Sequence, residues 1–185
     1  MVDDQALMIA VRDGEVDNLG ILFEQHHKKV YNFFLRQTSN HHASEDLVQE
    51  VFYRILKYRH TYRGESKFTT WMFRIAHNAM IDFYRKNKKQ ANLIEEAENI
   101  VSADPMPDDS VKRSSEAALL KKALAQLSQE KREVLLLSRF ENLKYEEIAK
   151  IMNCTVGTVK ALVFRALREL GTAYCKISGE KKNEM

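Results

Sequence analysis

Residues 62–89, YRGESKFTTWMFRIAHNAMIDFYRKNKK, combine a short glycine-containing loop with a strongly patterned helix that is predicted to begin near Phe68. Apolar side chains recur along this helix at spacings of three and four residues, which is typical of a helix with one buried face. These side chains are Phe68, Met72, Ile75, Ala76, Ala79 and Phe83. The stretch therefore predicts an amphipathic helix at the centre of an all-α fold.

A second face of the same helix carries an aromatic ring, two cations and an amide, again three, four and seven residues apart. These side chains are Trp71, Arg74, Asn78 and Arg85. A flat ring can stack on a base, cations can pair with phosphates, and an amide can bond a base edge. The face is therefore suited to single-stranded nucleic acid. The plainer alternative, a solvated basic face with a half-buried tryptophan, is the commoner outcome for one isolated helix.

Positive charge is concentrated around this helix. The 185-residue chain has a net charge of only +3, yet residues 54–89 contain just two acids, Glu65 and Asp82. The basic residues in that range are Arg54, Lys57, Arg59, Arg63, Lys67, Arg74, Arg85, Lys86, Lys88 and Lys89. A local basic surface of this kind attracts polyanions. A surface that serves only solubility usually interleaves both signs.

The composition limits the class of protein. With 44% hydrophobic and 30% charged residues the chain can bury a core, and its six glycines and two prolines argue against a turn-rich β protein. Cys154 and Cys175 form no paired motif. No stretch approaches the roughly 18 apolar residues of a membrane span, and the N-terminus lacks a targeting pattern. We expect a cytoplasmic protein with reduced thiols and no membrane contact of its own.

Three helices are predicted before the central stretch. Residues 4–12 form the first, which Gly14 would end, and a longer helix begins near Asp17. Ser44 is predicted to cap the third helix. The polar side of this third helix carries Asp46, Gln49, Glu50, Arg54 and Lys57. It is either a solvated face or a surface on which a partner docks.

Two histidine pairs, His26–His27 and His41–His42, raise the question of a metal site. Neighbours in sequence point away from each other on a helix, and no cysteine or carboxylate stands at ligand spacing. The chain also has no glycine-rich phosphate loop, no Ser/His/Asp order and no paired carboxylates at a plausible pocket. We therefore predict no metal site, no cofactor and no enzymatic activity.

An acidic segment divides the chain. Residues 95–109 contain six acids, both prolines and no lysine or arginine. Such a segment cannot pack a core, which predicts an extended linker over residues 95–113. The linker would join two small helical domains, residues 1–94 and residues 114–178, and residues 179–185 would form a tail.

Residues 143–170, LKYEEIAKIMNCTVGTVKALVFRALREL, predict a helix-turn-helix. The first helix, residues 145–152, would bury Ile148, Ala149 and Met152. Asn153 would make the turn, and Thr155 would cap the second helix. The residues expected on the outward face of the second helix, where they could enter a DNA groove, are Thr158, Lys160, Ala161, Phe164, Arg165 and Arg168. Two packed helices without a DNA role are the alternative.

Three signatures occur in order: DLVQEVFYRILKY at residues 46–58, YRGESKFTTWMFRIAHN at residues 62–78 and LKYEEIAKIMNCTVGTVK at residues 143–160. Together they resemble the extracytoplasmic-function (ECF) sigma factors of bacterial RNA polymerase, the smallest type of the sigma-70 family. The resemblance covers nearly the whole chain. It implies a protein that binds core RNA polymerase, directs it to promoters and melts the minus-ten element.

The resemblance also implies roles for individual residues. Those that would dock on the clamp helices of the polymerase are Asp46, Gln49, Glu50, Tyr53 and Arg54. Those that would bind the non-template single strand at minus-ten, with one base extruded beside the loop, are Arg63, Lys67, Phe68, Trp71, Arg74, Asn78 and Arg85. Those that would read the minus-thirty-five duplex are Thr155, Thr158, Lys160, Ala161, Phe164, Arg165 and Arg168. An anti-sigma factor is implied as a further partner, although no residue identifies it.

The chain departs from the family pattern at several positions. Family members often carry Ser-Arg at positions 161 and 162 and an arginine at position 167, so the minus-thirty-five sequence is not predicted. Lys144 replaces a common serine cap, so we expect a weaker helix start there.

Two other functions remain open from the residues alone. A stand-alone helix-turn-helix repressor would bind duplex DNA as a symmetric dimer, but the chain shows no clear dimerisation heptad. A metal hydrolase would have to use the paired histidines and would contain stoichiometric metal.

Overall fold

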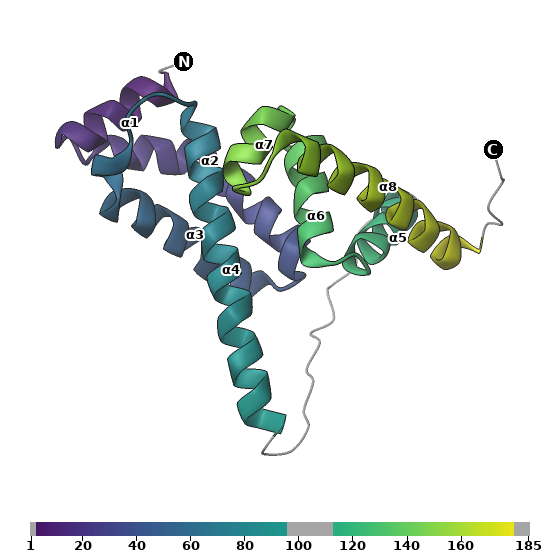
Figure 1. The fold of residues 1–185 in the computed structure, drawn as a ribbon. Coiled ribbons are helices and arrows are strands. Elements are labelled where there is room, and N and C mark those ends of the chain that lie inside the picture. Colours follow the sequence, from purple (N-terminus) through teal and green to yellow (C-terminus); the bar gives the residue numbers. More distant parts are fainter. Residues whose placement is uncertain (1–2, 96–112, 180–185) are drawn as a thin grey trace. The chain divides into compact units, whose positions relative to one another are not determined.

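The computed structural model describes residues 3–95 and 113–179, and these residues are helical without any strand (Figure 1). The predicted all-α fold class is therefore confirmed. The described residues group into two compact units, which we treat separately. Of the described residues, the first unit comprises 3–32 and 40–95, and the second comprises 33–39 and 113–179. The boundaries of the two predicted domains stay a prediction, because most of the acidic linker (residues 95–113) and of the tail (residues 179–185) lies outside the described residues.

The first unit begins with α1 (Asp4–Asp13). Asp3 caps it by accepting a hydrogen bond from the amide of Gln5, and Gly14 ends it in the left-handed conformation, with φ at 118°. The longer α2 (Asn18–Thr38) and α3 (His41–Lys57) follow. A 3-10 turn, η1 (Arg59–Thr61), leads to the loop before α4 (Phe68–Glu95).

The apolar stripe of α4 is buried as the sequence predicts. Met72 and Ala76 are fully buried and Ile75 nearly so, whereas Phe83 is only half-buried. The helix α4 packs against α3 and α1, and α1 also packs against η1 (Figure 1). This packing fixes the loop of residues 62–67 between α1 and the start of α4.

The predicted cap of α3 is wrong. The helix begins four residues earlier, because Asn40 is its cap and accepts a hydrogen bond from the amide of Ala43 at 2.9 Å. Ser44 is buried inside the helix, where its hydroxyl donates to the carbonyl of Asn40 at 2.5 Å. His41 and His42 therefore lie in the first turn of α3.

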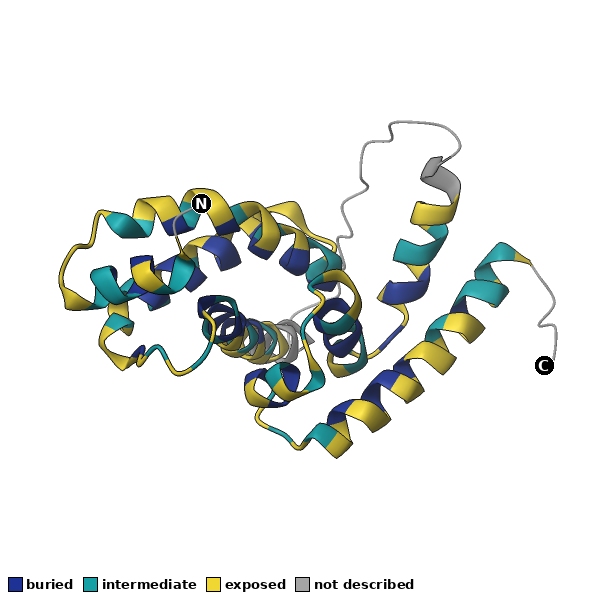
Figure 2. Cartoon of the chain, turned by 90° about the horizontal axis from the view of Figure 1, so that it is seen from above, coloured by how far each residue is buried: buried dark blue, intermediate teal, exposed yellow. Residues whose placement is uncertain are grey.

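In the second unit, α5 (Arg113–Ala125), α6 (Gln129–Leu135) and α7 (Tyr145–Ile151) all pack against α8 (Val156–Ser178). A π-helical turn, η2 (Leu136–Phe140), follows α6. One side of α8 is buried from Val159 to Ala173 and the other is exposed (Figure 2). The buried side is Val159, Leu162, Val163, Ala166 and Ala173, with Leu170 half-buried.

The start of α7 is better capped than the sequence suggests. Lys144 supplies no side-chain acceptor, but the carboxylate of Glu147 accepts a hydrogen bond from its backbone amide at 2.9 Å. Ile151, the last residue of α7, is buried. Met152, which follows it, was predicted to be buried but is half-buried.

The turn between α7 and α8 has the predicted chemistry. Asn153 adopts the left-handed conformation with φ at 50°, and Thr155 caps α8 by accepting a hydrogen bond from the amide of Thr158 at 3.1 Å. Asparagine adopts the left-handed conformation more readily than other non-glycine residues do.

We expect Asn153→Ala to lower the local stability of the helix-turn-helix by about 1 kcal/mol, because alanine is strained at this φ. Asn153→Gly is the matched control and should be close to neutral, because glycine adopts positive φ readily. Hydrogen exchange of the α7 and α8 amides in the full chain measures the difference. Equal protection in the two variants would contradict the assigned strain.

Candidate nucleic-acid interface

Trp71 is held in place by two buried aromatic rings. Its ring centroid lies 5.2 Å from that of Tyr62 and 6.4 Å from that of Phe68. Tyr62 and Phe68 are each only 1% exposed, whereas Trp71 is half-buried. The indole therefore packs on two buried rings on its inner side, and part of its outer surface stays accessible to a ligand.

A cavity of about 450 Å³ opens beside this tryptophan, between the loop after α3 and the first turns of α4. Its lining residues are Tyr58, Thr61, Tyr62, Arg63, Gly64, Glu65, Ser66, Trp71, Arg74, Ile75 and Asn78. Four side chains predicted to bind the single strand thus meet at one cavity: Arg63, Trp71, Arg74 and Asn78. Arg63, Arg74 and Asn78 are exposed, so their polar groups are accessible.

Three other predicted contacts do not line the cavity. Lys67 and Arg85 are exposed at other positions of the loop and of α4. Phe68 lies in the core, where it also approaches the ring of His26 with centroids 5.3 Å apart. In this conformation Phe68 supports Trp71 and is not itself accessible to a DNA strand.

The loop that forms one wall of the cavity is fixed by hydrogen bonds. The phenol of Tyr62 donates to the carbonyl of Ser66 at 3.0 Å, and Gln5 of α1 donates to the carbonyl of Gly64 at 2.6 Å. Gly64 has φ at 73°, which glycine adopts without strain. Burial, with smaller contributions from the charges of Asp3 and Asp4, raises the pKa of Tyr62 to about 12.

The raised pKa makes the loop sensitive to alkali. The folded state holds Tyr62 protonated, so its contribution to stability is complete below the ordinary tyrosine pKa near 10 and is lost as the pH rises towards 12. We expect ultraviolet titration at 295 nm to show one tyrosine ionising late, and Tyr62→Phe to remove that step. A titration curve for Tyr62→Phe that still contains the late step would contradict the assignment.

An ion-pair network connects α3 to α4. Arg54 pairs with Glu50 on its own helix at 2.6 Å and with Asp82 of α4 at 2.9 Å, and Asp82 also pairs with Arg85 at 2.8 Å. Burial lowers the pKa of Arg54, but the hydrogen bonds to Glu50 and Asp82 outweigh it and leave the pKa raised. Sequence reasoning did not predict that Asp82 pairs with the docking residue Arg54. The one indication in the sequence was that Asp82 is an acidic residue in a basic stretch.

The other residues predicted to dock on the polymerase form an open surface on α3. Asp46 and Gln49 are exposed, and Tyr53 is 58% exposed. Arg54 and Glu50 are both half-buried and are engaged with each other. The face thus divides into an open part and a part that also holds α3 to α4.

The outward face of α8 is accessible as predicted. Its exposed side chains are Thr158, Lys160, Ala161, Phe164, Arg165 and Arg168, and the capping residue Thr155 is exposed as well. Phe164 is 63% exposed, which is unusual for an apolar ring. The helix therefore presents cations together with an exposed aromatic ring.

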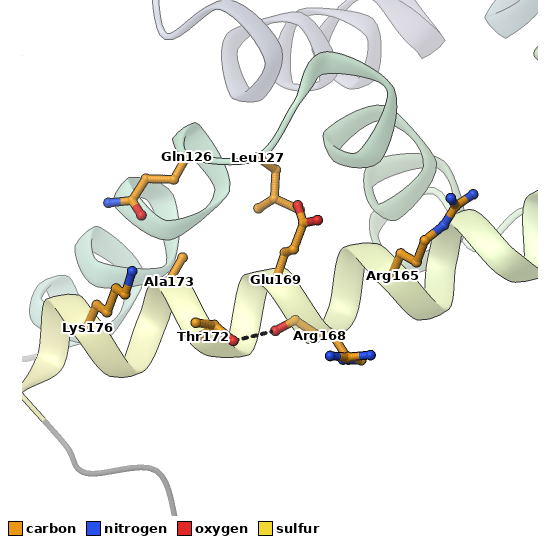
Figure 3. A pocket seen from close by; sticks show the side chains of 8 residues that line it. All are labelled: Gln126, Leu127, Arg165, Arg168, Glu169, Thr172, Ala173 and Lys176. Atoms are coloured by element: carbon orange, nitrogen blue, oxygen red, sulfur yellow. Dashed lines mark hydrogen bonds between the residues drawn. The ribbon is translucent and has the colours of Figure 1, made fainter.

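A second cavity, of about 400 Å³, lies between the α5–α6 connection and the middle of α8 (Figure 3). Its lining residues are Gln126, Leu127, Arg165, Arg168, Glu169, Thr172, Ala173 and Lys176. The hydroxyl of Thr172 donates to the carbonyl of Arg168 at 3.0 Å, and Glu169 pairs with Lys131. Two predicted DNA contacts, Arg165 and Arg168, thus also border this cavity.

Comparison with known proteins decides the family. The family model described as Sigma-70 region 2 matches residues 22–90, and that described as Sigma-70, region 4, matches residues 117–170. The chain is 31% identical to the ECF RNA polymerase sigma factor SigM of Bacillus subtilis over 157 residues, which cover 83% of this chain and 93% of that protein. The chain belongs to the ECF sigma factors. An ECF sigma factor directs bacterial RNA polymerase to promoter DNA, as the resemblance implied.

Two further relatives agree with this assignment. The RNA polymerase sigma factor YlaC of Bacillus subtilis is 29% identical over 168 residues, which cover 90% of this sigma factor and 97% of YlaC. The solved structure of the sigma factor RpoE in complex with the anti-sigma factor NepR from Bartonella quintana has a TM-score of 0.66 at 24% identity. The match covers 88% of this chain and 98% of that chain. This second likeness supports the fold.

Three of the four paired histidines form hydrogen bonds within the protein. His26 bonds Asp4 at 2.9 Å, His27 bonds the carbonyl of Phe23 at 2.9 Å, and His41 bonds the hydroxyl of Tyr31 at 2.6 Å. Within residues 3–95 and 113–179, no three metal-ligating side chains come together. None of the helices in those ranges is both long and apolar enough to span a membrane.

Proposed function

We propose that this sigma factor melts the minus-ten element by trapping one base of the non-template strand in the cavity beside Trp71. The observation that carries the proposal is that Arg63, Trp71, Arg74 and Asn78 converge on that cavity. An extruded base costs a few kcal/mol of lost stacking and pairing, and stacking on an aromatic ring offsets about 1–3 kcal/mol of this cost. The cavity supplies the ring, the cations and the amide that this exchange requires.

The other two surfaces have separate roles in the proposal. Asp46, Gln49 and Tyr53 dock on the core polymerase, together with the Glu50–Arg54 pair. The first turns of α8 enter the major groove at minus-thirty-five, because the N-terminal residues of a recognition helix reach base edges. Each unit makes few DNA contacts alone, so holding both on one polymerase supplies avidity.

The proposal also covers partner, place and chemistry. The sigma factor RpoE of Bartonella quintana was solved with an anti-sigma factor, and we propose that a protein of that kind masks the docking surface here. The protein acts in the bacterial cytoplasm, where core polymerase and chromosomal DNA are found. It contributes binding and no catalytic residue, and nucleotide chemistry stays with the polymerase.

Run-off transcription tests the proposed function. Purified core RNA polymerase is incubated with this protein and with genomic fragments of the source bacterium, and the start sites are sequenced. Discrete starts that share two upstream motifs and require the protein are expected. No protein-dependent starts, combined with tight duplex binding by the protein alone, would favour a repressor instead.

A further inference from the structure

The N-terminal helix α1 contacts the loop of the proposed base-capture cavity, although α1 precedes residues 22–90, the part matched by Sigma-70 region 2. The side-chain amide nitrogen of Gln5, Nε2, donates a hydrogen bond to the carbonyl oxygen of Gly64 at 2.6 Å. The bond is partly buried and joins residues 59 positions apart in the chain. Gly64 is also one of the residues that line the cavity.

The backbone of the loop lies directly against α1. A methyl group placed on Gly64 would come 3.5 Å from the end of the Ile9 side chain, which is an ordinary van der Waals distance. Arg12, at the other end of α1, reaches the carbonyl oxygen of Tyr62 at 3.5 Å. Contacts from both ends of one helix therefore meet the segment of residues 62–64.

The helix α1 is itself anchored and so can act as a rigid support. Met8 and Val11 are fully buried and Leu7 is 5% exposed. Asp4 bonds the ring of His26 on α2 at 2.9 Å. A loop tied to such a helix loses its freedom before DNA arrives, which lowers the ordering cost of binding.

We infer that α1 is part of the base-capture apparatus and that Gln5 is a positioning residue, which sets the loop wall of the cavity through Gly64. This inference rests on the proposed function, because it assigns Gln5 to the same cavity. Gln5 does not contact the base, and its hydrogen bond holds the loop backbone at the distance from Trp71 that a base requires.

The variants are chosen by hydrogen-bonding capacity. Gln5→Ala removes the donor, and Gln5→Glu keeps the size but offers only acceptors to the Gly64 carbonyl. Gln5→Lys restores a donor on a long side chain and should recover part of the effect. Gln25→Ala, at an exposed position of α2, is the matched control.

Promoter opening is measured with core polymerase and each full-length variant, using 2-aminopurine fluorescence on templates that carry single abasic sites along the non-template minus-ten strand. With the wild-type protein, the abasic scan identifies the captured position. On the intact template we expect Gln5→Ala and Gln5→Glu to reduce the equilibrium constant for open-complex formation about fivefold, because this is the effect of losing a typical hydrogen bond. On the template that is abasic at the captured position, the variants and wild type should give the same equilibrium constant, because this template has no base for the cavity to bind.

The outcomes separate the inference from the proposed function. If wild type opens the intact template and every abasic template equally well, no base is captured and the proposed function fails. If wild type shows the abasic effect but Gln5→Ala matches wild type on the intact template, only the inference fails. An equal loss by Gln5→Ala on the intact and abasic templates would mean a merely structural role and would also overturn it.

Discussion

Trp71→Ala is expected to reduce promoter opening about tenfold while leaving the affinity for core polymerase within a factor of two of wild type. The reason is that base–aromatic stacking contributes about 1–3 kcal/mol, and each 1.4 kcal/mol is a factor of ten. Trp71 is already held by Tyr62 and Phe68, so stacking on it costs little side-chain ordering. Permanganate footprinting reports the opening, and fluorescence anisotropy with labelled protein reports core binding.

Two controls separate base stacking from damage to the fold. Trp71→Phe keeps a flat ring on the same support and should retain most of the opening activity. Ile81→Ala removes an exposed apolar side chain elsewhere on α4, 43% exposed, and should have little effect on either measurement. If Trp71→Ala lost core affinity as strongly as opening, the assignment of this face to DNA would be wrong.

A premelted template sharpens the same experiment. If Trp71 acts by capturing an extruded base, part of its contribution offsets the cost of unpairing that base. A promoter with a mismatched bubble at minus-ten has already lost this pairing. On this template, wild type and Trp71→Ala should therefore melt the remaining base pairs equally well, although Trp71→Ala should still bind the bubble more weakly. If Trp71→Ala kept its tenfold opening defect on the bubble template, Trp71 would act in a different step.

The features that could be predicted from sequence are those set by local periodicity and turn chemistry. The buried stripe of α4 follows from apolar spacing, and Asn153 and Thr155 mark their turn and cap because few other residues suit those positions. The prediction for Ser44 failed because two good capping residues, Asn40 and Ser44, stand four positions apart. Local preference alone could not choose between them.

The features that could not be predicted join distant segments. The bond from Gln5 to Gly64 and the pairing of Arg54 with Asp82 both depend on how helices pack, and neither leaves a periodic signal in the chain. The dimensions of the cavity are of this kind as well. Sequence spacing placed Trp71, Arg74 and Asn78 on one face, and the resemblance implied that a base lies beside the loop. The sequence contains no pattern that reports the distance between this loop and α4.

Asp46→Lys is expected to weaken assembly with core polymerase about 100-fold, with little effect on the fold. The position is exposed on α3, and reversing a charge at a docking surface turns an attraction into a repulsion that costs a few kcal/mol. Competition binding against wild-type protein measures the change. Glu24→Lys, the same charge reversal at an exposed position of α2, is the control and should assemble normally.

Asp46 is a better probe than Glu50, although both belong to the predicted docking face. Glu50 accepts a hydrogen bond from Arg54, which in turn holds Asp82 of α4, so Glu50→Lys would also disturb the link between α3 and α4. A defect in Glu50→Lys could therefore arise from the fold as well as from the interface. Asp46→Lys avoids this ambiguity, and normal holoenzyme assembly by that variant would exclude this part of α3 from the docking surface.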